Sequence, residues 1–143
     1  MNGCNQYVTV WNRLKNPDDK QAPDIFYRKI LPVKCKYKTK VTRNEAEGGV
    51  IVKVMQIAVI PYTECYKEPN EWAVLDDSER SSYFTLQDGD ILALGAILYD
   101  ITGITPWRET DVKEKLKPDV MTIKTVHNNT RCNQGRHWKV EGV

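Results

Sequence analysis

The stretch YFTLQDGDILALGAILYDI, Tyr83–Ile101, decides the fold class. It reads as two apolar β-strands hinged at Gly89 and Gly95. The Asp88–Gly89 pair is a strong turn signal, because glycine readily adopts the positive φ that tight turns require. From Ile91 onward the residues are almost all apolar, so we expect a strand buried on both faces, with a bulge or close backbone crossing at Gly95. This element predicts the centre of a β-barrel or β-sandwich.

Further segments with the composition of strands lie on both sides of this centre. Alternating or continuous apolar residues predict strands over 7–11, 25–33, 33–41, 50–60, 119–127 and 136–140. The run Val50–Ile60 is the longest of these and predicts a central strand that Pro61 ends. Loops are expected at Asn12–Asp24, Arg43–Gly49 and Glu64–Ser82. The predicted fold is therefore mainly β, a small barrel or sandwich with long loops.

One segment departs from the β pattern. Thr105 suits a helix cap, Pro106 suits the first helical position and Pro118 suits the end, so we expect one short α-helix over about 106–116. Its narrow apolar stripe indicates a helix at the surface or against a neighbouring subunit. A chain of 143 residues has the size of one domain. We assign residues 7–143 to a single β-barrel-like domain and residues 1–6 to a flexible N-terminus.

The overall composition gives little information about partners. The 21 Lys and Arg against 19 Asp and Glu leave a net charge of +2, which is too small to indicate nucleic acid or a membrane. No apolar run approaches the length that spans a bilayer. The cysteines contain no Cys-x-x-Cys pair or zinc-ligand spacing and no apolar signal core precedes them, so we expect reduced thiols, no metal and no other cofactor. They are Cys4, Cys35, Cys65 and Cys132.

The distribution of charge is more informative than its sum. Lys34, Lys36, Lys38 and Lys40 occupy alternate positions, so a strand would place them on one face. Seven basic residues and no acidic one lie between Arg28 and Arg43. Two interpretations remain open: a solvated edge that lysines protect from aggregation, or a positive ladder that faces an acidic partner or DNA phosphates.

No catalytic constellation is apparent, so an enzyme is not expected. The chain has no G-x-S-x-G, no phosphate-binding glycine loop, no H-E-x-x-H and only two histidines. An acid pair or cation site from Asp88, Asp90 and Asp100 is conceivable, but a tight turn favours Asp at the first two positions for conformational reasons. His137 and Trp138 near the chain end, and Trp107 on the expected helix, are interpreted as subunit-interface residues.

An ordered set of segments resembles a known family. The segments are VTVWNRL, VIPY, EW, YFTLQDGDILALG, ITGIT, MTIKTVHNN and GRHWKVEGV. Over Val8–Val143 the chain resembles structural proteins of tailed phages and prophages, encoded among the head and neck genes as minor capsid or head–tail connector proteins. The resemblance implies a β-barrel subunit of a six- or twelve-fold ring below the portal, which joins head to tail and continues the DNA channel. The all-β pattern favours a stopper over a helical adaptor, and a tail-completion role stays open.

The resemblance also implies partners and a location. These are the portal or adaptor ring, the tail proteins and packaged double-stranded DNA, in the virion neck after assembly in the bacterial host cytoplasm, with no membrane. The lysine row Lys34–Lys40 is not part of the resemblance, and Glu141 departs from the glycine-rich end of the family. The alternative function is a small OB- or SH3-like nucleic-acid-binding barrel whose lysine row contacts backbone phosphates.

Overall fold

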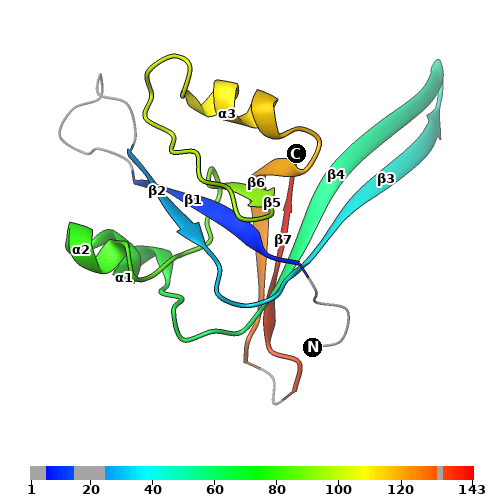
Figure 1. Cartoon of the computed structure of the whole chain (residues 1–143). Coiled ribbons are helices and arrows are strands. Elements are labelled where there is room, and N and C mark those ends of the chain that lie inside the picture. The colour runs from blue at the N-terminus through cyan, green and yellow to red at the C-terminus, as the bar shows by residue number, and fades with distance from the viewer. Residues whose placement is uncertain (1–5, 15–24, 132–133) are drawn as a thin grey trace.

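The computed structural model describes residues 6–14, 25–131 and 134–143, and it is mainly β, with 48% strand and 14% helix. Seven strands form one antiparallel sheet in the order β2-β1-β5-β6-β7-β4-β3 (Figure 1). The strands are β1 Val8–Leu14, β2 Ile25–Ile30, β3 Lys36–Ala46, β4 Gly49–Pro61, β5 Ile91–Leu94, β6 Val120–Asn129 and β7 His137–Gly142. The helices are α1 Pro69–Ala73, α2 Asp77–Arg80 and α3 Glu109–Leu116.

The predicted mainly β class is confirmed, and the sheet is not closed into a barrel. Its end strands are β2 and β3, which are not paired with each other. An isolated bridge joins Gln6, just before β1, to Cys35, just before β3, and the Gln6 side-chain Oε1 accepts the Tyr37 N–H at 2.9 Å. Gln6, which the sequence assigns to a flexible N-terminus, is therefore paired. This bridge brings the start of β1 beside the start of β3, so the sheet curls toward closure.

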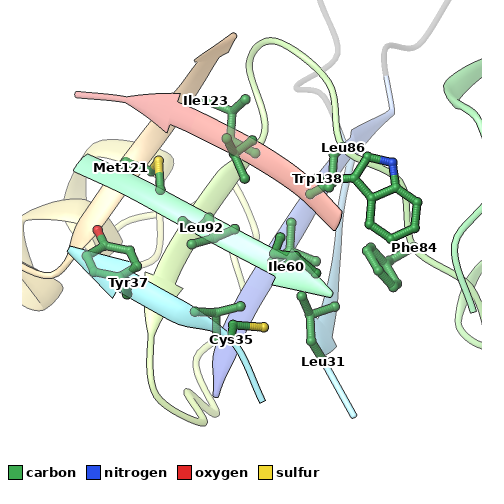
Figure 2. Packing of buried hydrophobic residues seen from close by; sticks show 14 residues of the cluster. Leu31, Cys35, Tyr37, Ile60, Phe84, Leu86, Leu92, Met121, Ile123 and Trp138 are labelled. Carbon is green, nitrogen blue, oxygen red and sulfur yellow. The ribbon is translucent and has the colours of Figure 1, made fainter. Parts of the chain in front are cut away.

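Apolar side chains pack on both faces of the curled sheet. Because side chains alternate along a strand, Val8 and Val10 of β1 enter one core while Trp11 enters the other. Figure 2 shows the first core, to which most strands contribute. Its largest fully buried members are Leu31, Ile60, Phe84, Leu86, Leu92, Met121, Ile123 and Trp138. The second core lies beneath α3 and the segment that precedes it, and consists of Trp11, Ile91, Ala93, Ile101, Val112 and Val120.

The expectation for Tyr83–Ile101 was correct at its centre and wrong at both ends. Only Ile91–Leu94 forms a strand, and Ile91, Leu92 and Ala93 are fully buried. The preceding segment contributes a single bridge, Phe84 to Tyr66, rather than a strand. The Asp88–Gly89 turn is present, with Gly89 at a φ of 95°. The first predicted strand is replaced by irregular backbone.

Beyond β5 the chain leaves the sheet at Gly95. The Gly95 N–H donates to the Tyr7 carbonyl, and the Thr9 hydroxyl donates to the Gly95 carbonyl and accepts the Ile97 N–H, which turns the backbone away from β1. Gly95 has a φ of 96°, which glycine adopts without strain. Leu98 and Tyr99 consequently lie exposed. Burial on both faces from Ile91 to Ile101, as expected from the sequence, was therefore wrong for residues 94–100, which are exposed or partly buried, whereas Ile101 returns to the second core.

The C-terminal helix is shorter than expected, and two further helices are present. Thr105 and Pro106 lie before α3, because the Trp107 carbonyl accepts the Thr102 and Gly103 N–H groups and closes a turn there. Arg108 caps the helix instead, donating its N–H to the Asp111 carboxylate while its guanidinium pairs with the same group. The helix ends at Leu116, close to Pro118 as expected.

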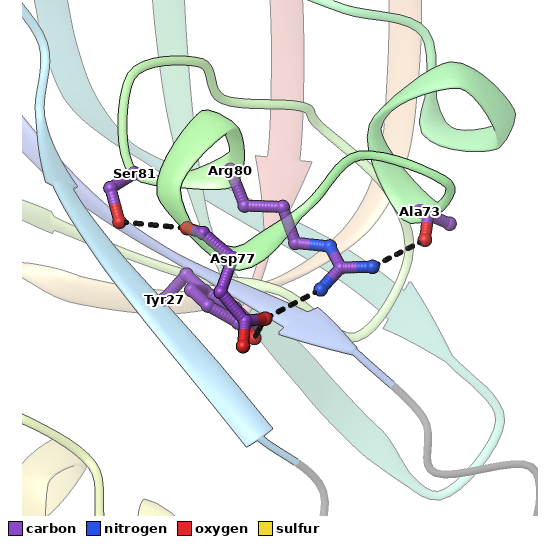
Figure 3. Close-up of polar contacts among 5 residues, drawn as sticks. All are labelled: Tyr27, Ala73, Asp77, Arg80 and Ser81. Atoms are coloured by element: carbon purple, nitrogen blue, oxygen red, sulfur yellow. Dashed lines mark hydrogen bonds and ion pairs between the residues drawn. The ribbon is translucent and has the colours of Figure 1, made fainter.

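The two unexpected helices, α1 and α2, lie within the predicted loop Glu64–Ser82. Trp72 of α1 is buried, in an edge-to-face contact with Tyr27 of β2. In Figure 3 the Tyr27 hydroxyl and the Arg80 guanidinium both meet the Asp77 carboxylate, at 2.9 and 2.8 Å. Burial raises the pKa of Tyr27, and its hydrogen bond to Asp77 raises it further. A polar segment thus becomes helical where one tryptophan anchors it to the sheet.

The β1–β2 and β6–β7 hairpins are built from strands that the sequence predicted over 7–11, 25–33, 119–127 and 136–140. Strand β2 pairs antiparallel with β1 from Ile25 to Ile30, although residues 15–24 of the expected loop lie outside the described residues. Strand β7 pairs with β6 and with β4. At Gly142 a side chain would collide with the Thr122 carbonyl of β6. This glycine lets the chain end lie between two strands at a close approach.

Candidate functional site

The β3–β4 hairpin extends beyond the body of the molecule (Figure 1). Strand β4 pairs with β7 only over Gln56–Pro61, whereas it pairs with β3 along nearly its whole length. Its first half, Gly49–Met55, therefore has a strand on one side only. We call residues 38–55 the arm. The prediction that Val50–Ile60 forms a central strand was wrong for this half.

A two-residue turn closes the arm. Ala46 pairs with Gly49, so only Glu47 and Gly48 connect the strands, and Gly48 has a φ of 98°. Tight hairpin turns favour glycine at such positions. The loop expected over Arg43–Gly49 is thus mostly strand, because the two strands stay paired up to this turn.

One face of the arm is apolar and exposed. Cross-strand pairs place Val41 beside Val54, Arg43 beside Val52 and Glu45 beside Val50, all on one face. We call this the valine face; Val41, Val50, Val52 and Val54 are between 49% and 63% exposed. Toward the body the same face continues through the pair of Tyr37 and Ala58 into the first core. The arm therefore extends the core-facing side of the sheet beyond the core itself.

The opposite face of the hairpin, which we call the lysine face, carries three residues of the lysine row. Lys36, Lys38 and Lys40 alternate with the residues of the valine face, and Lys53 lies on their side because it pairs with Thr42. The three row lysines in β3 are exposed, and Lys34 is exposed just before the strand. The predicted one-face arrangement therefore applies to the three lysines within β3. What this face contacts remains a prediction.

The three residues interpreted as subunit-interface positions have different environments. Trp138 is buried, with its ring centroid 4.2 Å from that of Tyr66, so it is a core residue rather than an exposed interface residue. His137 is half-buried, with Nδ1 2.6 Å from the Gly135 carbonyl and Nε2 3.2 Å from the Asn129 amide. Trp107 is half-buried beside Tyr99, with ring centroids 5.2 Å apart.

Trp107 lies on a small hollow that sequence reasoning did not identify. The hollow has a volume of about 230 Å³ and is lined by Leu98, Tyr99, Asp100, Thr102 and Trp107. Asp100 pairs with Arg28 of β2 at 3.1 Å. Trp107 thus keeps a surface that another molecule can contact, and its interface role stays a prediction.

A buried carboxyl group lies at the turn before β5. Asp90 Oδ1 accepts the Arg13 N–H at 2.8 Å, and Oδ2 accepts the Asn12 side-chain amide at 2.8 Å and the Gln87 N–H at 3.2 Å. Burial raises the pKa of Asp90 to about 7, against the lowering effect of these donors. Asn12 also contacts the Thr85 backbone through both its amide nitrogen and oxygen. Asp90 and Asn12 together fasten β1 to the turn.

This arrangement corrects the explanation of Asp90 by turn preference. Asp88 is exposed, Asp90 is buried, and Asp100 is paired with Arg28, so the three do not form one site. Turn preference alone explains Asp88 but not Asp90, whose carboxylate binds β1. Nothing in the local sequence distinguishes the two positions, because the Asn12 partner is distant in the chain.

Other functional groups are distributed without clustering in the part of the chain that the structure describes. Within those residues no group of three or more His, Cys, Asp and Glu side chains is placed to hold a metal ion. No helix among them is long and apolar enough to cross a membrane. Cys35 is buried and Cys65 partly buried, while Cys4 and Cys132 lie outside the described residues.

Comparison with known proteins identifies a family. Residues 3–143 match the model of a family of unknown function, DUF6751. No curated protein matched the chain, and no solved structure matched it. Because the match spans nearly the whole chain, including every described strand and helix, the chain belongs to the family DUF6751.

Proposed function

We propose that this protein is a structural subunit of a tailed-phage virion, a stopper-like head–tail connector that forms a ring below the portal. In this role it joins head to tail and continues the DNA channel. Its partners are the portal or adaptor ring, tail proteins and packaged double-stranded DNA, in the neck of a virion assembled in the bacterial cytoplasm. It acts through binding surfaces and carries no catalytic site.

The observation that supports an assembly role is the exposed valine face of the arm. An isolated two-stranded hairpin is marginally stable in water, and it gains stability when its apolar face is covered. Covering a valine fully is worth about 1.5–3 kcal/mol, so burying the exposed half of four such side chains contributes roughly 3–6 kcal/mol before the costs of association. The arm therefore favours a protein that functions in contact with another protein chain.

The assignment to a phage neck is supported by the sequence resemblance. The resembling segments lie mainly in the body: VTVWNRL forms β1, MTIKTVHNN lies in β6, and HWKVEG forms β7. The arm lies outside these segments. We infer that the body carries the features shared with connector proteins and that the arm adds a contact surface.

The proposal is tested by deleting the gene in the phage that encodes this chain and examining the lysate by electron microscopy. We expect DNA-filled heads without tails, heads that lose their DNA, and free tails, all restored by the wild-type gene supplied in trans. Mass spectrometry of wild-type virions should detect the protein. Infectious, normally tailed particles without the protein would overturn the assignment.

A pair of matched variants tests the part played by the arm. Val52→Lys places a charge on the valine face, and Asn44→Lys places the same charge on the opposite, exposed face of the same hairpin. We expect Val52→Lys to fail to restore tailed particles and Asn44→Lys to restore them. Equal restoration by the two variants would show that the valine face is not used in the virion.

The lysine face favours the alternative function, a nucleic-acid-binding protein. Three exposed lysines on one strand face, with Lys53 beside them, can follow a phosphate backbone. The two functions make different demands on the free protein: the alternative requires strong, salt-dependent DNA binding in isolation, whereas the connector role requires contact with DNA only inside the assembled channel.

A further inference from the structure

The valine face has a charge pattern that is complementary to itself. Arg43 and Glu45 lie two positions apart on this face, beside Val52 and Val50 of the neighbouring strand. Neither belongs to an ion pair among the residues that the structure describes. One positive and one negative group thus flank a midpoint at the level of Asn44 and its partner Ile51.

A single two-fold axis brings both the apolar and the charged residues of two arms into matching contact. If two arms pack face to face in opposite directions about an axis at the level of Asn44, Arg43 of each lies over the partner's Glu45. The cross-strand register then places Val52 of each over the partner's Val50. Two-fold interfaces pair the same surface patches reciprocally, so every contact is made twice.

The lysines on the opposite face favour contact through the valine faces. Lys36, Lys38, Lys40 and Lys53 would meet like charges if two lysine faces were stacked, whereas they remain solvated when the valine faces meet. The product is a four-stranded, two-layer sandwich in place of two exposed hairpins. Such a sandwich has the second layer that a lone hairpin lacks.

We propose that the free protein forms a weak two-fold dimer in which the valine faces of two arms pack together, fixed by reciprocal Arg43–Glu45 ion pairs. The contact covers only the ends of the arms, so it is smaller than a standard stable interface and forms a dimer that exchanges readily. This pairing goes beyond the proposed virion role, because it concerns the protein before it meets any other partner. A ring subunit that must wait for its partner would keep its apolar arm covered in this way.

Charge reversal tests the pairing with a pattern that loss of folding cannot imitate. Sedimentation of wild-type protein over a concentration series should show a monomer–dimer equilibrium. Arg43→Glu and Glu45→Arg should each weaken self-association at least about tenfold, because each puts like charges opposite one another. A one-to-one mixture of the two variants should dimerise, since both acidic side chains of the first variant then face both basic side chains of the second. The double variant R43E/E45R should self-associate as wild type does.

Two further variants locate the contact. Val52→Lys should abolish the dimer, and Lys40→Gln, on the opposite face, should leave it unchanged; circular dichroism checks that both remain folded. A wild-type protein that is monomeric at every concentration, or a variant mixture that stays monomeric, would overturn the pairing. The virion role is tested separately. If a dimer-deficient R43E variant is incorporated into virions, the virion role stands whether or not the free protein dimerises.

Discussion

The two halves of strand β4 have similar composition and opposite environments. Residues 56–61 have a strand on each side and place Ala58 and Ile60 in the first core. Residues 49–55 pair with β3 alone, and Val50, Ile51, Val52 and Val54 are exposed. Both halves are rich in β-branched residues. An apolar strand is therefore buried only where a second strand and an opposing layer are available.

The largest expected effect comes from replacing one residue in each half of β4. Ile60→Ala should lower the free energy of unfolding by about 2–5 kcal/mol, because it leaves a cavity in a packed core. Val52→Ala should lower it by less than about 1 kcal/mol in the monomer, since this side chain is already half-exposed. Urea denaturation at low protein concentration measures both. Equal losses of stability would show that the arm is packed against the body.

The body was predicted from the sequence better than the arm, for a physical reason. Alternating residues identified β1, β6 and β7 as strands, and a continuous apolar run placed Ile91 and Leu92 in the core, since a strand buried on both faces carries apolar residues at successive positions. In the arm both faces of β4 are exposed although the residues are apolar, so its valines were interpreted as the interior of a central strand. The alternating lysines were the available signal, since a strand with lysines along one face must have that face in water.

Contacts between distant segments were beyond the reach of local patterns. Asn12 and Asp90 are 78 positions apart, and neither motif nor spacing indicated their hydrogen bond. The helices α1 and α2 were missed because they are short and depend on Trp72 and Tyr27 rather than on helix propensity. Likewise, the Trp107 carbonyl accepts hydrogen bonds from the backbone of Thr102 and Gly103, and the turn that they close makes α3 start later than Pro106 indicated.

The second prediction concerns pH and the body alone. Because burial raises the pKa of Asp90 to about 7, above the ordinary value of 3.8, the folded state retains a proton that the unfolded state releases between these pH values. The retained proton stabilises the folded state. This contribution is fully present below about pH 4 and is lost as pH rises through 7. Relative to Asp90→Asn, the wild-type unfolding free energy should therefore fall by up to about 4 kcal/mol over this range.

The matched control is Asp88→Asn, in the same turn but exposed. Asp88→Asn should keep the pH dependence of the wild-type unfolding free energy. Asp90→Asn should lose the fall between about pH 4 and pH 7, whatever the absolute stability of that variant. Denaturant unfolding from pH 4 to pH 8 provides the comparison. If the wild type and Asp90→Asn have parallel profiles, Asp90 is ionised in the folded protein throughout, and its hydrogen-bond donors outweigh its burial.

The smallest effect on stability is expected on the lysine face of the arm. Replacing Lys34, Lys36, Lys38 and Lys40 together by glutamine changes exposed side chains and leaves Tyr37, Thr39 and Val41 in place, so the unfolding free energy should change by less than about 1 kcal/mol. The informative measurement is DNA binding by the isolated protein at several salt concentrations. If this row binds DNA, the quadruple variant should have a lower affinity, and its salt slope should shrink by up to about 0.9 for each phosphate that the protein no longer neutralises.

The connector role predicts a different result for the same quadruple variant. In that role the free wild-type protein binds DNA only weakly, and the substitution acts instead on ring assembly or on retention of the genome in particles. Replacing Lys115, Lys117 and Lys124, which are exposed on or near α3 and on β6, removes three positive charges outside the lysine row and separates a local contact from net charge. The nucleic-acid-binding function would be favoured if the wild type and the control bind DNA with submicromolar affinity at physiological salt and the quadruple variant does not. A strand face that is only solvated has no such requirement for charge at these positions.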